Sequence, residues 1–113
     1  MPRPVRQGDV TYISGGIGVT EQRALESQAR NYDLAITNAN NAGDFTVGTA
    51  LVIQSKNGKD ILRVGGTGPL FYAKLPPGEY VIHASNDGQK RMRDVKIASG
   101  CTLDVHLIWP QKG

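Results

Sequence analysis

The stretch that decides the fold is Leu75-Pro76-Pro77-Gly78-Glu79-Tyr80-Val81-Ile82-His83-Ala84-Ser85-Asn86-Asp87-Gly88. Its two prolines and glycine predict a tight turn, because proline presets φ and glycine accepts positive φ. Beyond the turn, Tyr80, Ile82 and Ala84 recur at every second position, which predicts a strand with one buried face. Asn86-Asp87-Gly88 then predicts a reversal of the chain.

The same pattern continues toward the C-terminus. Val95 and Ile97 end the next predicted strand on its core side, and Ser99-Gly100 turns the chain once more. The last predicted strand has four apolar residues on one face and is stopped by Pro110: Leu103, Val105, Leu107 and Trp109. The final third of the chain is therefore expected to form strands joined by short turns.

Further strands are predicted on the N-terminal side of the deciding stretch. Asn57-Gly58 is a strong hairpin signal between two of them. In chain order the predicted strands are Tyr32–Thr37 (half-buried), Thr46–Gln54 (with Val47, Leu51 and Ile53 as core candidates), Asp60–Val64 and Leu70–Lys74.

The first third of the chain is less regular. Residues 1–9 are rich in proline and polar residues and predict a flexible N-terminal arm. Val10–Ile13 is β-prone, and a glycine-rich loop follows it. A helix is predicted over about 20–30, with Thr20 as its N-cap and Leu25 on the face that packs on a sheet.

Together these elements define the expected fold class. Short strands separated by Gly/Pro turns are typical of sandwiches and barrels, and 113 residues allow one domain. We therefore expect a mainly β protein: an antiparallel Greek-key β-sandwich of about seven strands, with one short N-terminal helix. The sandwich is expected to occupy residues 10–110 as a single domain, helix included.

The block from Leu75 to Leu107 resembles the carboxypeptidase regulatory-like domain, a transthyretin-like sandwich that is also similar to collagen-adhesin B-type repeats. The shared pattern is Leu-Pro-Pro-Gly-x-Tyr at residues 75–80, a turn glycine at Gly88, Val-x-Ile at residues 95–97, then Gly100 and Val105. Residues 12–18, followed by a short helix, look like small bacterial envelope proteins that carry this domain. The resemblance implies an exported or periplasmic accessory, adhesive or sugar-binding module, and it does not by itself specify a task.

Composition and charge exclude several classes. The net charge is +3 with a pI near 9.2, and the densest basic cluster, Lys90, Arg91, Arg93 and Lys96, is interrupted by Asp94. We interpret it as solvated surface, so a nucleic-acid partner is not expected. The single cysteine, Cys101, allows no internal disulfide and is predicted to be a buried small side chain. No apolar run reaches membrane-spanning length and no leader is evident, so an exported protein would be present here in its mature form.

No complete catalytic, metal or cofactor motif is present in the sequence. Gly16-x-Gly18-x-x-Glu21 follows a strand and precedes a helix, but it lacks the third glycine of a dinucleotide fingerprint. A small anion held by backbone amides near Gly18–Thr20 stays a weak alternative. His83 and His106 are predicted on the faces opposite the apolar sets of their strands, as structural histidines. We therefore predict no enzyme activity, no metal and no cofactor.

The leading hypothesis is a non-catalytic accessory or interaction module of the bacterial envelope that binds or supports an unidentified protein. The alternative is a carbohydrate or small-ligand binding module in which exposed aromatic side chains stack on the ligand. Tyr12, Tyr72 and Trp109 are the residues that could form such a contact. A third alternative is an enzyme of unrecognised type at the glycine loop, or at a cleft that joins a carboxylate to His83 or His106.

Overall fold

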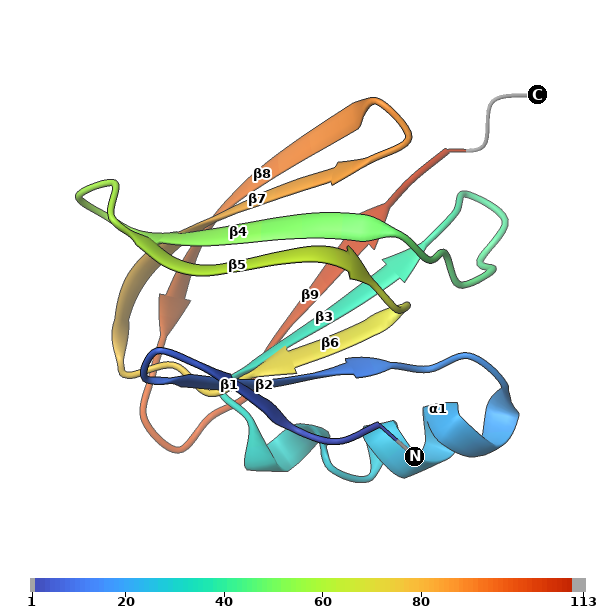
Figure 1. Cartoon of the computed structure of the whole chain (residues 1–113), viewed down its shortest axis with the longest axis horizontal. Coiled ribbons are helices and arrows are strands. Elements are labelled where there is room, and N and C mark those ends of the chain that lie inside the picture. The colour runs from blue at the N-terminus through green and yellow to red at the C-terminus, as the bar shows by residue number, and fades with distance from the viewer. Residues whose placement is uncertain (1, 111–113) are drawn as a thin grey trace.

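A computed structural model describes residues 2–110 as two stacked β-sheets (Figure 1). The five-stranded sheet has the order β1 (Val5–Gln7), β2 (Val10–Gly15), β6 (Leu70–Ala73), β3 (Leu34–Ala39), β9 (Leu103–Ile108). The four-stranded sheet has the order β5 (Asp60–Thr67), β4 (Thr49–Ser55), β7 (Gly78–Asn86), β8 (Gln89–Ile97). The predicted β-sandwich is confirmed, with nine strands in the described residues where about seven were expected.

One pair of strands departs from the antiparallel expectation. β3 and β9 run parallel, with Leu34 opposite Leu103 and Ile36 opposite Val105. Parallel neighbours need a long connection, and here the chain passes through all four strands of the other sheet before β9 returns beside β3. The remaining strand pairs are antiparallel.

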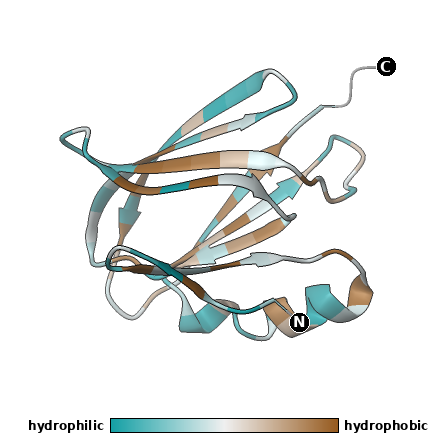
Figure 2. Ribbon diagram, viewed as in Figure 1, coloured by the Kyte–Doolittle hydropathy of each residue, from teal (hydrophilic) through white to brown (hydrophobic). Residues whose placement is uncertain are grey.

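The main core fills the space between the two sheets. Figure 2 shows hydrophobic residues, in brown, on strands of both sheets. Tyr80, Ile82 and Ala84 of β7 are buried there, as the alternation predicted. From the other sheet, Val105 and Leu107 of β9 are buried and Trp109 beyond it is 2% exposed. Leu103 and Val95 are partly buried against the same core. The C-terminal alternation therefore identified the core correctly.

The proline turn is locked by the aromatic residue that follows it. The Tyr80 hydroxyl donates a hydrogen bond to the carbonyl of Pro76 at 2.7 Å. This bond satisfies the polar end of a ring whose body lies in the core, and burial, followed by the charge of Asp33, raises the Tyr80 pKa. The predicted Asn57-Gly58 hairpin is also present and joins β4 to β5.

The helix is shorter than predicted and starts differently. α1 spans Val19–Glu26, and a separate 3-10 turn, η1, spans Ala29–Asn31. Thr20 lies inside α1, so its prediction as N-cap is wrong; Gly18 occupies the cap position without a side-chain hydrogen bond. α1 lies against the outer face of the five-stranded sheet (Figure 1).

The helix gives this sheet a second apolar layer. Leu25 and Tyr32 pack with residues from three strands, Ile13, Ala35, Leu70 and Tyr72. Consequently β3 is buried on both faces over Leu34, Ala35 and Ile36, where half-burial had been expected. A strand covered on both sides loses the polar alternation that the sequence prediction assumed.

Residues 5–7 are not part of a loose arm. They form β1, which pairs with β2 through Val5 opposite Tyr12. The Gln7 side chain donates to the backbone carbonyl of Arg63 at 3.0 Å and accepts from its N–H at 2.9 Å. The N-terminal segment therefore joins the edges of the two sheets, which local composition could not reveal.

The predicted strand Thr46–Gln54 starts late. β4 begins at Thr49, and Val47 is 56% exposed, so Val47 is not a core residue. Residues 45–48 instead cross from one sheet to the other, with the N–H of Thr46 donating to Asn38 and that of Gly48 donating to Thr67. Leu51 and Ile53 are buried as predicted. No helix in the described residues is long and apolar enough to cross a membrane.

Candidate functional site

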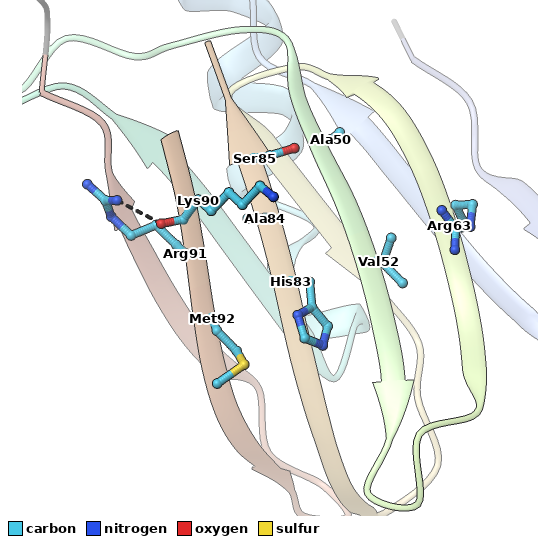
Figure 3. Close-up of a pocket in the computed structure, with 9 residues that line it drawn as sticks. All are labelled: Ala50, Val52, Arg63, His83, Ala84, Ser85, Lys90, Arg91 and Met92. Carbon is cyan, nitrogen blue, oxygen red and sulfur yellow. Dashed lines mark hydrogen bonds between the residues drawn. The ribbon is translucent and has the colours of Figure 1, made fainter. Parts of the chain in front are cut away.

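The outer face of the four-stranded sheet carries a shallow groove of about 550 Å³ (Figure 3). Within residues 2–110 no helix covers this face, whereas α1 covers part of the other sheet (Figure 1). The groove crosses four strands and is lined by Ala50, Val52, Arg63, His83, Ala84, Ser85, Lys90, Arg91 and Met92.

Strand register brings these residues together. Val52 of β4 lies opposite Arg63 of β5 and opposite His83 of β7, and His83 lies opposite Met92 of β8. The neighbouring row joins Ala50, Ser85 and Lys90 in the same way. Residues two apart on a strand project from the same face, so both rows face the groove. The small side chains of Ala50 and Ser85 in the second row make room for the hollow.

The groove is positively charged. Arg63, Lys90 and Arg91 line it, and no Asp or Glu is among its lining residues. Met92 is 60% exposed and adds an adaptable apolar surface on β8, across His83 from Val52. The combination favours a ligand that carries negative charge and some apolar surface.

A chain of hydrogen bonds holds His83 in place. Its Nε2 lies 3.0 Å from Gln54 Oε1, and Gln54 Nε2 donates to Asp60 Oδ1 at 2.7 Å. The Asp60 carboxylate only accepts, so the amide nitrogen of Gln54 must face it and the amide oxygen must face His83. His83 therefore carries a proton on Nε2, which leaves Nδ1 as the acceptor of the neutral ring.

Asp60 is stabilised as an anion at the end of this chain. Hydrogen bonds from Gln54 and Arg63 lower the Asp60 pKa, and the Arg63 contact is 2.8 Å long. The network orients His83 and Arg63 toward the groove without supplying a nucleophile. Ser85 and His83 stand two positions apart on β7, about 7 Å by strand rise, and among the described residues no hydrogen bond joins them.

Arg91 links the groove to the last strand. Its guanidinium donates to the carbonyls of Lys90 at 2.8 Å and Ile108 at 3.2 Å, and lies 5.1 Å from the centre of the Trp109 ring. Gln89 donates to the carbonyl of Pro110 at 3.0 Å. β8 is thereby fastened to the end of β9 on the other sheet, which holds the groove's rim in position.

The three aromatic residues predicted to contact a ligand do not form a platform. Tyr72 is 3% exposed and packs in the core beneath α1. Trp109 is 2% exposed and its indole donates to Asn38 Oδ1 at 3.0 Å in the main core. Tyr12 is half-buried and stacks on Phe71, with ring centroids 5.4 Å apart. The exposed stacking surface that a sugar-binding module requires is therefore contradicted at Tyr72 and Trp109.

A smaller hollow of about 380 Å³ on the other sheet contains Tyr72, His106 and two carboxylates, Glu26 and Asp104. Burial, followed by the charges of Glu26 and Asp104, raises the Tyr72 pKa to about 12. The Tyr72 phenol therefore stays protonated at neutral pH. His106 meets a carboxylate here, as the enzyme alternative required, and the Thr37 hydroxyl lies on the strand position opposite it. Among the described residues no hydrogen bond joins Thr37 to His106, so the pair is not arranged as a nucleophile and its base.

The remaining candidates from the sequence stay apart. His83 and His106 lie on the outer faces of different sheets, as their alternation predicted. Cys101 is exposed, so its predicted burial is wrong. It lies in the turn before β9, which begins at Leu103, and the alternation of buried and exposed residues therefore does not extend to it. Residues 2–110 contain no group of three or more His, Cys, Asp or Glu placed to hold a metal ion.

The glycine loop is occupied by the protein's own carboxylate. Glu21 Oε1 accepts a hydrogen bond from the N–H of Gly16 at 2.8 Å. An anion at the amides of Gly18–Thr20 would lie beside this carboxylate, whose like charge opposes its binding. The loop is thus an internal brace between β2 and the helix.

The sequence did not indicate the groove because its parts come from four strands. Lys90 and Arg91 had been noted as surface charge, which they are. Their convergence with Arg63 depends on a strand order that no local pattern encodes. His83 on an outward-facing position was the one available signal.

The fold and this groove define a β-sandwich protein with one open, basic sheet face. No protein-family model and no curated protein matches the chain. Among solved structures, the chain is similar to BcpA, the major pilin subunit of Bacillus cereus, with 22% identity and a TM-score of 0.49. The match covers 68% of this chain and 28% of that chain, so this chain spans less than a third of the pilin's length. We transfer nothing of the pilin's role.

Proposed function

We propose that this β-sandwich is a non-catalytic interaction module that binds an acidic segment of a partner protein in the groove of the four-stranded sheet. The observation that carries the proposal is the charge of the groove lining, which contains Arg63, Lys90 and Arg91 and no Asp or Glu; Asp60, which pairs with Arg63, lies outside the lining. Opposite charge across an interface gives specificity and speeds association.

The apolar part of the groove favours a protein over a polyanion. Val52, Met92 and Ala50 can pack against side chains of a bound segment, whereas a phosphate backbone would leave them uncovered. The orientation of His83 by Gln54 adds a fixed hydrogen-bonding group. We therefore expect a segment in which acidic and apolar residues alternate.

A peptide of alternating Glu and Val tests the proposal. Titrated into isotope-labelled protein, it should shift the NMR signals of His83 and Met92, and its affinity should fall with added salt. Lys90→Glu should weaken binding by about tenfold or more, because it reverses a charge in the groove. Lys59→Glu is the matched control: it makes the same charge change in the β4–β5 turn, away from the groove, and should leave the affinity close to that of the parent protein.

The outcome separates three possibilities. Equal losses from Lys90→Glu and Lys59→Glu would mean that only net charge matters, which would overturn the proposed site. A homopolymeric single-stranded DNA that binds this groove more tightly than the peptide would overturn the choice of a protein partner. A peptide of alternating Lys and Val should not bind.

We also propose that the module works in the bacterial envelope. The support is the sequence resemblance of residues 75–107 to carboxypeptidase regulatory-like domains. Fractionation of cells that express the full-length gene from its own promoter tests this location. Recovery in the cytoplasmic fraction alone would refute it.

A further inference from the structure

The two sheets have four edge strands, which differ in length and in the side-chain contacts on their backbone groups. β1 has three residues. The Gln7 side chain covers both backbone groups of Arg63 on β5. The carbonyls of Ile108 and Pro110, at the end of β9, accept from Arg91 and Gln89. β8 is the longest of the four, with nine residues, and along it, in the described chain, the carbonyls of Lys90 and Met92 accept hydrogen bonds from arginine side chains.

The β7–β8 turn determines which backbone groups of β8 face outward. Asp87 and Gly88 both have positive φ, 49° and 79°, as a type I′ turn requires. Asn86 and Gln89 flank this two-residue turn and are paired with each other. In a two-residue hairpin the flanking pair exchanges hydrogen bonds, and alternate pairs along an antiparallel ladder do the same. The N–H and C=O groups of residues 90, 92, 94 and 96 therefore point away from β7.

Two side-chain contacts agree with this assignment. The guanidinium of Arg91 donates to the carbonyl of Lys90 at 2.8 Å, and that of Arg93 donates to the carbonyl of Met92 at 3.0 Å. Both acceptors belong to the outward-facing set. The edge thus presents free N–H donors together with carbonyls that two arginines cover.

Charge selects what can pair with this edge. β8 carries Lys90, Arg91, Arg93 and Lys96 against the single acid Asp94. A second copy of β8 would bring the same cations alongside, so charge opposes self-pairing of this edge, as in other protected edge strands. A strand rich in Glu or Asp would instead offer carboxylates to Arg91 and Arg93. The two guanidinium groups would then release the carbonyls of Lys90 and Met92 for pairing with the added strand.

We infer that an extended acidic segment of a partner protein adds to β8 as a further strand of the four-stranded sheet. This inference rests on the proposed function and specifies how the partner binds. Alternate side chains of the added strand would lie beside Lys90 and Met92, which line the groove, while its backbone pairs with residues 90, 92, 94 and 96. Affinity then comes from main-chain hydrogen bonds, and selectivity comes from charge.

Hydrogen exchange on the intact protein tests the pairing. With the Glu-Val peptide bound, exchange of the amides of residues 90, 92, 94 and 96 should slow, whereas residues 91, 93 and 95, already paired to β7, should change little. Binding without this alternation would overturn strand addition and leave the proposed function standing. Absence of any binding would overturn the proposed function, and strand addition with it.

A pair of variants at one position checks the result from the protein side. Met92→Pro removes an outward N–H without touching the β7 ladder, and Met92→Thr keeps that N–H while removing the same side chain. We expect Met92→Pro to weaken peptide binding by about tenfold relative to Met92→Thr, as loss of a main-chain hydrogen bond predicts. Equal affinities of the two variants, with both shown to be folded by NMR, would refute strand addition.

Discussion

The hydrogen bond between Trp109 and Asn38 offers the sharpest test of the core. The Trp109 indole donates to Asn38 Oδ1 at 3.0 Å, and the two residues are 2% and 0% exposed. Asn38→Leu would leave the indole N–H without a partner in a dry interior, which costs about 1–3 kcal/mol of unfolding free energy. Trp109→Phe would leave the Asn38 oxygen unpaired and open a small cavity, for a loss of about 1–3 kcal/mol.

The double variant should lose less than the sum of the two single losses. With both polar groups removed, neither is left buried without a hydrogen-bond partner, so we expect a coupling energy of about 1–2 kcal/mol. The weaker contact of the Asn38 amide with the carbonyl of Pro69, 3.4 Å long, is lost wherever Asn38 is replaced and cancels in the cycle.

Urea denaturation followed by circular dichroism measures all four proteins. Fluorescence is unsuitable because Trp109 is the only tryptophan and one variant lacks it. Losses that add within about 0.5 kcal/mol would show that the bond contributes no coupling and would refute the reasoning. A Trp109→Phe variant as stable as the parent protein would contradict the buried position of the indole.

Three further predictions follow from local geometry. Gly68→Ala should lower the unfolding free energy by about 1–3 kcal/mol, because the new Cβ would lie 2.6 Å from the backbone oxygen of Gly15. Gly65→Ala places its Cβ in open space and should change the unfolding free energy by less than about 0.5 kcal/mol. Thermal unfolding of the two variants compares them. Gln7→Ala should speed hydrogen exchange at the Arg63 amide, which would lose its acceptor; an unchanged rate would contradict the β1–β5 contact. The folded-state pKa of Tyr72 is raised to about 12, so the free energy of unfolding should be unaffected below about pH 10 and should fall as pH rises toward 12. Tyr72→Phe removes the titrating phenol and should make this fall shallower in urea titrations at alkaline pH.

Local patterns predicted β7 and β9 well because each of these strands has one wet and one dry face. Tyr80, Ile82, Val105 and Leu107 repeat at every second position and are buried in the main core. Turn residues added the register: Pro76 and Gly78 set the start of β7, and Asp87-Gly88 set its reversal into β8. The alternation and the turns were sufficient for a β-sandwich.

The errors have a common physical cause, which is that contact between distant segments, or the lack of it, decides which side chains are buried. The helix buries the second face of β3, and so Ala35 and Tyr72 are buried where alternation or exposure had been expected. The polar N-terminal segment is ordered by Arg63, fifty-six residues away. Val47 is apolar but lies in the crossing between the sheets, where no neighbour covers it.

Periodicity and turn residues were enough to predict a β-sandwich with one short helix and the inward residues of its C-terminal strands, and the sequence contains no complete catalytic motif. The folded chain was needed to reveal the parallel pairing of β3 with β9, the burial of Tyr72, and the basic groove that gathers Arg63, His83 and Lys90. The reason is that periodicity and turn chemistry are local, whereas strand order and register depend on which distant surfaces bury one another best.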